Sequence, residues 1–335
     1  YNTAKTSEHK NSEVGIAQTI LNNLTQDHQV FVCEMGAYGK GGIALLSKMA
    51  KPQIAILTGA NEQHLATFGS VKNLLSAEGG EELVRSLPDG GVVIANLDSE
   101  LLRKQLPIYQ EKYKNRKFIF CSAKEKAEVW ANNINAEKDR VLFTVHVGQE
   151  EARFEAKILG KHNIENILLA VAAAKECGMS LQELAESAKR ITDEINPMKL
   201  KKGVGGLNII DSTYSANPDG VLAALEYLKT WPGKKVIVMP CLIELGKASS
   251  AAHFRIGEKI AEMCDLAVIV TADKFKELKN GAQSRGMQEG QIIYIENPEI
   301  VLAKVKEIIK EKDDIVLLEG RIPDTMKQKF ISPSL

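Results

Sequence analysis

Short apolar runs alternate with amphipathic segments along this chain, most clearly in its second half. After residue 206, five β-branched runs are separated by segments whose apolar residues recur at helical spacing. The predicted strands are residues 207–211, 235–239, 266–271, 292–295 and 314–319. The predicted helices are residues 218–229, 250–264, 273–279 and 298–310. Strands that alternate with helices predict a mostly parallel sheet covered on both faces.

The first half of the chain begins with the same kind of pattern. Helical spacing predicts helices over 13–24 and 43–49, and apolar runs predict strands over 29–35, 53–58 and 92–98. Ser70 is a good N-cap for a helix that we expect to reach residue 87. Gly79 and Gly80 lie inside that helix, where each should cost ~1 kcal/mol relative to Ala. We expect a closely packed backbone or a bound ligand to explain them.

The character of the sequence changes at residue 117. Segments 117–121, 128–134, 140–147 and 151–159 are strand-like, and the last two alternate in polarity, so we expect antiparallel strands and a hairpin. Helices are predicted over 164–177 and 181–191. Asn196-Pro197 then marks a domain boundary, which gives domains 1–196 and 197–335. The predicted fold class is therefore α/β, with a mostly parallel sheet plus a smaller antiparallel part, followed by a Rossmann-like domain.

Composition excludes several classes of protein. The 335 residues carry 43 basic and 43 acidic side chains, so a broad surface for nucleic acid or anionic membrane is not expected. The five cysteines include no C-x-x-C pair, which argues against a zinc site or a disulfide framework and fits a reducing cytoplasm. No apolar run reaches the roughly 18 residues of a membrane span. We expect a cytoplasmic monomer, and Tyr1 in place of Met indicates processing or a fragment.

Polar residues follow the predicted strands of the first half, where ligands bind in open α/β sheets. Glu34 ends one apolar run, His64 follows the next, and Glu78 lies on the helix after it. Two carboxylates and an imidazole that converge there could hold a divalent cation, although Mg²⁺ prefers oxygen ligands. The alternative is structural: Glu34 caps a neighbouring segment and His64 closes a loop.

Three further polar clusters begin helices or follow strands. The candidate contacts are His162, Asn163 and Asn166 in the first, Asp211, Tyr214 and Asn217 in the second, and Glu244 in the third. Asparagine amides at a helix start could read the edge of a base, whereas capping and core packing are the structural alternative. The loop from Asp211 is a natural nucleotide contact, but such loops are also polar for turn reasons alone.

A phosphate-binding loop is missing from the sequence. No G-x-x-x-x-G-K-[ST] motif occurs in the 335 residues. Gly39-Lys40 lacks both the spacing and the hydroxyl residue after the lysine.

Six motifs in order carry a resemblance to a known family. They are Asn11-Ser-Glu-Val-Gly15, Glu34-Met-Gly-Ala37 with Gly42-Ile43, His64-Leu65 with Phe68-Gly-Ser70, Gly160-Lys-His-Asn163 with Asn166, Asp211 through Pro218, and Glu244-Leu-Gly246. In this order and spacing they resemble the Mur ligases, from about residue 8 to residue 325. The branch they resemble most adds D-alanyl-D-alanine to the UDP-N-acetylmuramoyl-tripeptide of peptidoglycan synthesis.

The resemblance implies a fold and a reaction. Mur ligases have a UDP-sugar-binding domain, an ATPase domain and a C-terminal Rossmann-like domain, and this chain resembles the second and third. ATP phosphorylates a substrate carboxylate, and an amine attacks the acyl phosphate to form an amide. The implied cofactors are ATP and Mg²⁺, and the implied partners are a UDP-N-acetylmuramoyl peptide and D-alanyl-D-alanine.

The resemblance also implies roles for individual residues. Glu34, His64 and Glu78 would hold Mg²⁺ and act in catalysis. The clusters that begin at His162 and Asp211 would contact the nucleotide, the second when the domains close. Asn11, Ser12 and Glu244 would contact the substrates.

Three positions depart from the family pattern. Glu78 stands where the family has a carbamylated lysine, and it supplies a carboxylate on a shorter stem. Lys199, a candidate catalytic residue, replaces an arginine and loses its bidentate fork. Pro240-Cys241 replaces the Gly-Asp that precedes Glu-Leu-Gly, which changes the expected recognition of the amine.

Two rival hypotheses stay open. Without a phosphate loop the chain could be a non-catalytic nucleotide-binding or partner-binding module, and we expect it to turn over ATP poorly by itself. A sibling ligase of the Mur, cyanophycin or folate-polyglutamate type would keep the chemistry and change the amine.

Overall fold

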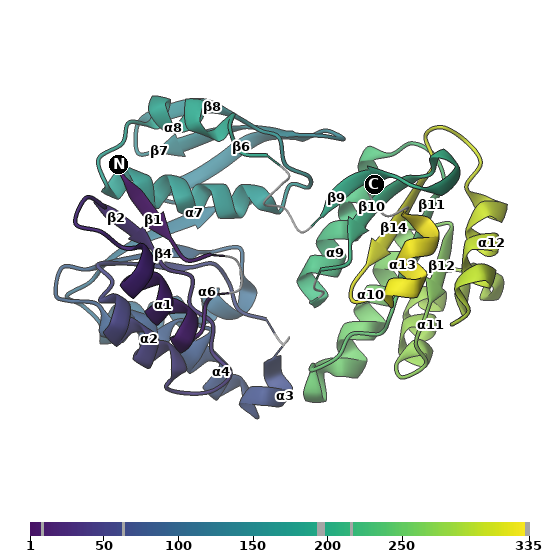
Figure 1. Cartoon of the computed structure of the whole chain (residues 1–335), viewed down its shortest axis with the longest axis horizontal. Helices are drawn as coiled ribbons and strands as arrows, with labels where there is room; N and C mark the ends of the chain where they lie inside the picture. The colour runs from purple at the N-terminus through teal and green to yellow at the C-terminus, as the bar shows by residue number, and fades with distance from the viewer. Residues whose placement is uncertain (8–9, 62–63, 193–197, 215–216, 332–335) are drawn as a thin grey trace. The chain divides into compact units, whose positions relative to one another are not determined.

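Two compact units make up the chain. The computed structural model describes residues 1–7, 10–61, 64–192, 198–214 and 217–331, and Figure 1 shows their helices and strands. One unit contains Tyr1–Ala60, His64–Trp130 and Leu168–Gly178, and the other consists mainly of Ala131–Ile167 and Met179–Leu335. The predicted boundary at Asn196-Pro197 lies outside the described residues. The α/β fold class is confirmed.

A small parallel sheet begins the chain. It pairs β1 (Thr3–Lys5) with β2 (Val30–Val32), and α1 (Glu13–Asn23) connects the two strands. The strand predicted over 29–35 is thus shorter than expected and ends before Glu34. Because β2 pairs with β1 and not with β3, these strands form a sheet of their own.

The second sheet has six strands in the order β3-β4-β5-β6-β7-β8. Its strands are β3 (Ile54–Leu57), β4 (Val92–Asn96), β5 (Lys117–Ser122), β6 (Val129–Ala136), β7 (Val141–Val147) and β8 (Glu150–Ala156). β3 through β6 pair in parallel, whereas β7 and β8 form the expected antiparallel hairpin. The expectation of antiparallel pairing from residue 117 onward was therefore wrong for β5.

The reason is a helix that the sequence pattern did not predict. α6 (Glu100–Lys112) carries the chain from β4 back to the start of β5, and such a crossover makes the strands parallel. Its buried residues Leu102, Leu106 and Tyr109 have helical spacing and could have revealed it. Pro107 in its interior is typical of a helix end or a loop and obscured that pattern.

Two glycines divide the helix predicted from Ser70 to residue 87. The structure has α4 (Val71–Ala77) and α5 (Glu81–Ser86) instead, with Gly80 at φ +87° between them. Ser70 is the N-cap as predicted, and its hydroxyl accepts the Asn73 N–H at 3.2 Å. A side chain at Gly80 would overlap Leu57 on β3, so close packing accounts for this glycine.

A buried carboxylate caps the earlier helix α2 (Gly42–Ala50). Its N-cap is Gly41, which has no side chain to accept the first N–H groups. Glu82, only 2% exposed, accepts the N–H of Gly41 at 2.7 Å and that of Ala44 at 3.0 Å. The carboxylate thus supplies acceptors for main-chain donors that would otherwise be unpaired at the helix start.

The predicted helices over 164–177 and 181–191 are present as α7 (Asn163–Glu176) and α8 (Leu181–Ala188), the second ending three residues early. The short helix α3 (Leu65–Phe68) was not predicted. A capping box of Ser180 and Glu183 begins α8. One core cluster gathers Ile16, Ile43 and Leu74 from α1, α2 and α4, and a second packs α5 and α6 on β3 and β4.

The C-terminal sheet has the order β13-β12-β11-β14-β10-β9. Its strands are β9 (Lys199–Lys202), β10 (Asn208–Ser212), β11 (Lys235–Met239), β12 (Leu266–Ile269), β13 (Ile292–Tyr294) and β14 (Ile315–Glu319). All neighbours pair in parallel except β9, which is antiparallel to β10. The five predicted strands are confirmed to within two residues, and β9 was missed.

Helices cover both faces of this sheet (Figure 1). They are α9 (Pro218–Tyr227), α10 (Ser249–Met263), α11 (Phe275–Ser284), α12 (Pro298–Ile308) and α13 (Asp324–Phe330). One core cluster contains side chains of α9, α10 and α11, and the other contains those of α12 and α13. The strand β14, the last in the sequence, lies between β10 and β11. The order in which strands are added across the sheet therefore reverses between β13 and β14. Ligand crevices in such folds form at the strand ends beside this reversal.

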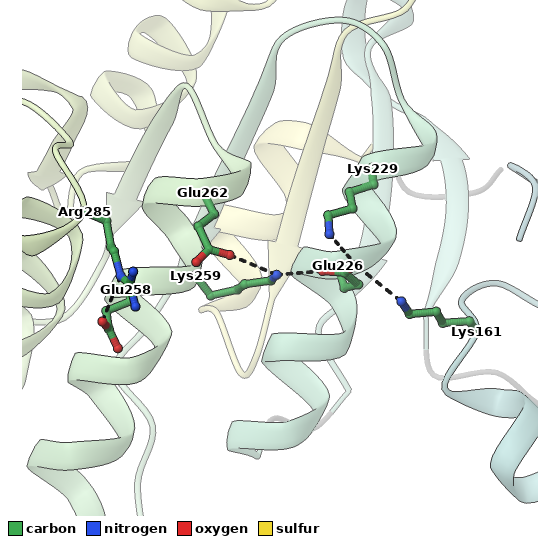
Figure 2. Close-up of polar contacts among 7 residues, drawn as sticks. All are labelled: Lys161, Glu226, Lys229, Glu258, Lys259, Glu262 and Arg285. Atoms are coloured by element: carbon green, nitrogen blue, oxygen red, sulfur yellow. Dashed lines mark hydrogen bonds and ion pairs between the residues drawn. The ribbon is translucent and has the colours of Figure 1, made fainter. Parts of the chain in front are cut away.

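Ion pairs join the helices on one face. Figure 2 shows Lys259 of α10 between Glu226 of α9, at 2.6 Å, and Glu262, at 3.1 Å. Arg285 pairs with Glu258 at 3.0 Å. Burial would raise the pKa of Glu226, but hydrogen bonds from Lys229 and Lys259 outweigh it and lower the pKa to about 2. The carboxylate therefore stays charged and keeps these contacts at neutral pH.

None of the described helices is both long and apolar enough to cross a membrane.

The substitution Gly80→Ala should destabilise the protein by about 2 kcal/mol, because φ is positive there and the new methyl group overlaps Leu57. Gly39→Ala is the matched control, since nothing lies within 4 Å of the added atom. Urea unfolding followed by circular dichroism measures both. Equal midpoints for the two variants would contradict the packing argument.

Candidate functional site

Glu34 lies just past β2 and is exposed, so it does not point into the apolar core. Its carboxylate accepts the side-chain amide of Asn11 at 2.9 Å, and its N–H donates to the Thr6 hydroxyl at 3.0 Å. Gly36 donates its N–H to the Asn11 carbonyl at 2.9 Å. The structure therefore brings together two predicted site residues, Asn11 and Glu34. Ser12, the third residue of this region, is the N-cap of α1.

His64 and Glu78 form a direct pair. His64 Nδ1 lies 2.6 Å from Glu78 Oε1, and both side chains are part-buried. His64 is the N-cap of α3, whereas Glu78 is the C-cap of α4. The turn of α3 and the break at Gly79-Gly80 thus position an imidazole and a carboxylate against each other, as the sequence predicted for these two residues.

The three predicted metal ligands are not assembled as one set. Across the described residues, no group of three His, Cys, Asp or Glu side chains is placed to hold a metal ion. Glu34 follows β2 of the two-stranded sheet, whereas His64 follows β3, the first strand of the six-stranded sheet β3-β4-β5-β6-β7-β8. Each carboxylate is already bonded, Glu34 to Asn11 and Glu78 to His64. The arrangement therefore does not fit a three-ligand site for Mg²⁺ as it stands.

The cluster at the start of α7 is tightly packed. Asn163 is buried, donates to the Leu159 carbonyl at 2.7 Å, and lies 3.2 Å from His162 Nε2. Burial lowers the pKa of His162 to about 4, so the ring is neutral at pH 7. Gly160 has φ +85°, and a side chain there would overlap the His162 ring. The amide nitrogen of Asn163 is thus bonded within its own segment, whereas Asn166 is exposed on the first turn.

Asp211 is the centre of a charged network at the end of β10. It is 6% exposed and accepts Lys201 at 2.7 Å, Lys327 at 3.1 Å and the Thr213 hydroxyl at 2.6 Å. Burial alone would raise the pKa of Asp211, but hydrogen bonds from Lys201, Thr213 and Lys327 hold it below its ordinary value. The carboxylate is therefore ionised, and its two lysine partners were not predicted from the sequence.

The other predicted residues of this region lie around Asp211. Lys199 begins β9 and is opposite Asp211 in the strand register. Tyr214 is 60% exposed. Asn217 is the N-cap of α9, where its side chain accepts the Gly220 N–H at 2.8 Å. Asn217 therefore has the capping role that the structural alternative predicted, and Tyr214 is an exposed side chain of the described part of this loop.

Glu244 is displayed on the loop that follows β11. It is exposed and has φ +67°, one of three non-glycine residues with positive φ in the described chain. Residues other than glycine keep a positive φ only when the surrounding structure holds the backbone in that conformation. The restraint on this loop therefore has to come from its neighbours.

Sequence reasoning missed Glu319 at the end of β14. Its side chain is 1% exposed, and its Oε2 has no hydrogen-bond partner. Burial raises the pKa of Glu319 to about 8, against smaller opposing contributions from the Ser212 hydroxyl and the Gly320 N–H. The signal in the sequence is a charged residue at the end of an otherwise apolar strand, beside the point where the sheet reverses.

Comparisons with known proteins agree with this architecture. The family description "Mur ligase middle domain" matches residues 1–174, and "Mur ligase, glutamate ligase domain" matches residues 198–322.

Curated relatives are similar over most of the chain. The UDP-N-acetylmuramoyl-tripeptide--D-alanyl-D-alanine ligase of Haemophilus influenzae is 29% identical over 253 residues, 75% of this chain and 52% of the relative. The ligase of the same name from Escherichia coli is 28% identical over 261 residues, 77% of this chain and 56% of the relative. The chain thus spans about half the length of the relatives it matches.

Solved structures share the fold. MurF from Acinetobacter baumannii superposes with a TM-score of 0.83 at 24% identity, covering 98% of this chain and 69% of that chain. The MurF ligase of Thermotoga maritima in complex with ADP gives a TM-score of 0.77 at 22% identity, covering 98% of this chain and 74% of that one.

Glu319→Gln should remove a pH dependence of stability. Because the pKa of Glu319 is raised on folding, stability is fully present below pH 4.5 and is lost as the pH rises towards 8, by roughly 1.4 kcal/mol per pH unit. The Glu319→Gln variant cannot ionise at this position. Its free energy of unfolding, relative to that of the unchanged protein, should therefore increase by roughly 3 kcal/mol between pH 4.5 and 7.

Urea unfolding at a series of pH values measures this difference. The exposed control Glu311→Gln should give a curve parallel to that of the unchanged protein. A constant difference between Glu319→Gln and the unchanged protein across this pH range would show that Glu319 is not held neutral.

Proposed function

This chain belongs to the Mur ligase family, and we propose that it carries the ATP-dependent amide ligase function that adds D-alanyl-D-alanine to a UDP-N-acetylmuramoyl peptide. The proposed chemistry is activation of a carboxylate as an acyl phosphate, followed by attack of an amine. The family as a whole consists of acid–amino-acid ligases, and the choice of D-alanyl-D-alanine rests on relatives at 28–29% identity. The proposed location is the cytoplasm, with the domains bounded near residue 196.

A single observation supports the proposal most strongly. Two family descriptions match in the expected order over residues 1–174 and 198–322, and all six sequence motifs fall within these two matches. Phosphoryl and acyl transfer depend on positioning and on neutralising charge, which requires polar groups at fixed strand ends. His64 with Glu78, and Asp211 with its lysines, are such groups.

The nucleotide would be ATP. A charged carboxylate at the end of β10 could accept hydrogen bonds from hydroxyl and amino groups of that nucleotide. Asp211 is an ionised acceptor that Lys201 and Lys327 keep charged. Both lysine side chains are about one-third exposed, so an anionic group of a ligand can reach them. We propose that Asp211, Tyr214 and Asn217 contact the nucleotide, together with His162, Asn163 and Asn166. Lys199 is the proposed substitute for the family's arginine.

The substrate contacts belong to two loops. We propose that Asn11 and Ser12 face the UDP-N-acetylmuramoyl peptide and that Glu244 faces the amine. An exposed carboxylate suits the ammonium group of an incoming dipeptide. Glu34, His64 and Glu78, the Mg²⁺ ligands expected from the sequence, do not form one site here, so we assign them no ion and no step through one.

A second candidate function is favoured by one observation, the missing phosphate-loop motif. Without its run of main-chain N–H groups, nothing of the usual kind cradles the β- and γ-phosphates. The chain by itself would then bind nucleotide or a partner without turnover. Pro240-Cys241, in turn, favours the sibling-ligase alternative, since it changes the loop that precedes Glu244.

The 335-residue chain alone should release phosphate from ATP no faster than a blank when supplied with Mg²⁺, UDP-N-acetylmuramoyl-tripeptide and D-alanyl-D-alanine. The reason is the missing phosphate loop. Coupled phosphate release and mass spectrometry of the pentapeptide product measure the reaction. Product formed in stoichiometric proportion to phosphate would refute this expectation and would exclude the non-catalytic alternative.

D-alanyl-D-alanine should bind the chain even without turnover, and Glu244→Gln should weaken that binding about tenfold by removing a charge-assisted contact. Titration calorimetry with Glu311→Gln as the exposed control measures the difference. An unchanged dissociation constant in Glu244→Gln would overturn the assignment of Glu244 to the amine. Equal affinity for L-alanyl-L-alanine would contradict the choice of D-alanyl-D-alanine as the substrate.

A further inference from the structure

The loop between β11 and η5 (Gly246–Ala248) is anchored at several points. Cys241, Leu242 and Leu245 are buried, whereas Ile243 is 64% exposed and Glu244 lies beside it at φ +67°. With Pro240, which is also buried, the loop thus buries four side chains and displays two. A conformation of this kind persists only if main-chain groups of the buried residues are also satisfied.

His253 supplies one of these contacts from α10. The imidazole is completely buried, and its Nε2 accepts the Leu242 N–H at 2.9 Å. Its Nδ1 lies 2.7 Å from the Ser249 carbonyl oxygen, which can only accept. Because Nε2 is an acceptor and Nδ1 must donate, the geometry selects the neutral ring with its proton on Nδ1.

Neighbouring side chains hold the start of the loop. The Cys241 N–H donates to the Thr271 hydroxyl at 2.8 Å, and the Lys274 N–H donates to Cys241 Sγ at 3.3 Å. These contacts come from the segment after β12, whereas the contact to Leu242 comes from α10. Of these contacts, the hydrogen bond from the Leu242 N–H to the imidazole is the one next to the displayed pair Ile243-Glu244.

We propose that His253 is a positioning residue, which holds the loop 240–246 in the conformation that displays Glu244, and that it does so as the neutral Nδ1–H tautomer. The choice of Glu244 as the displayed group rests on the proposed function. The role goes beyond that function, since it predicts how the loop responds to protons.

Protonation of the ring would remove the acceptor for Leu242. Burial lowers the pKa of His253, opposed by the Ser249 carbonyl and by Glu277 of α11, with Lys274 acting in the same direction as burial. The loop should therefore be held at neutral pH and released only in acid, as the pH falls below the ordinary histidine range. Release would free Leu242 N–H and let Glu244 leave its left-handed conformation.

Two substitutions in the full chain separate positioning from packing. His253→Leu removes the acceptor, whereas His253→Gln keeps an acceptor in the same place but cannot titrate. Amide hydrogen exchange of Leu242, compared with that of Val238 within β11, should be about tenfold faster in His253→Leu and close to unchanged in His253→Gln. His28→Gln, in the other unit, is the matched control.

The unchanged protein provides the remaining tests, so the proposal stands or falls even if His253→Leu does not fold. Long-range ¹H–¹⁵N spectra should show the proton on Nδ1. Protection of Leu242 relative to Val238 should decrease as the pH is lowered below 6.5, and it should be constant in His253→Gln. A proton on Nε2, constant protection in the unchanged protein, or equally fast exchange in His253→Gln and His253→Leu would each overturn the proposal.

A titration with D-alanyl-D-alanine links the loop to function. His253→Leu should weaken the chemical-shift response of the Ile243 and Glu244 amides about as much as Glu244→Gln weakens binding, and His253→Gln should restore it. If the unchanged protein shows no response, the proposed function is contradicted while the exchange results still decide the role of His253.

Discussion

Buried side-chain acceptors for main-chain N–H groups hold the loops of this protein in place. Glu82 accepts the N–H groups at the start of α2, and His253 accepts the N–H of Leu242. Main-chain donors at a helix start or in a loop after a strand have no partner in a regular hydrogen-bond ladder, so a side-chain acceptor satisfies them. Replacing such an acceptor leaves the donor unpaired, which is why side chains far from any ligand can control the shape of a site.

The same constraint explains the arrangement around Glu34. Its carboxylate already accepts the Asn11 amide, and its N–H is bonded to Thr6, so these bonds hold Glu34 against the segment between β1 and α1. His64 and Glu78 belong to the helices after β3. Since β2 and β3 are not hydrogen-bonded to each other, no shared strand ladder fixes the spacing between these groups. His64 and Glu78 are therefore in contact, whereas Glu34 remains bonded beside the two-stranded sheet.

The sequence predicted the C-terminal sheet well, since strands such as β11 are apolar on both faces and have clear helical segments between them. It failed where local signals conflicted. Pro107 concealed α6, and the short strand β9, Lys199–Lys202, has no apolar alternation. The polar residues of the site were found because they follow strands. The lysine partners of Asp211 were not found. Lys201 was missed with the strand β9 that carries it, and the Lys327 pair depends on a contact 116 positions apart in the chain.

Two carboxyl groups at adjacent strand ends illustrate why environment and not residue type decides the chemistry. Asp211 shares the core face of Ile209, towards α13, and two lysines keep it ionised. Glu319 is paired in register with Ser212 and shares the face of Leu317, which belongs to the core cluster of α9 and α10, and burial favours the neutral form of Glu319. The sheet separates the two groups by its pleat, so one end of one sheet holds a fixed negative charge on one side and a proton donor on the other. Environments that push pKa values apart in this way give two identical functional groups different roles. In this protein the strand alternation, set by the sequence period of two, is what produces that difference.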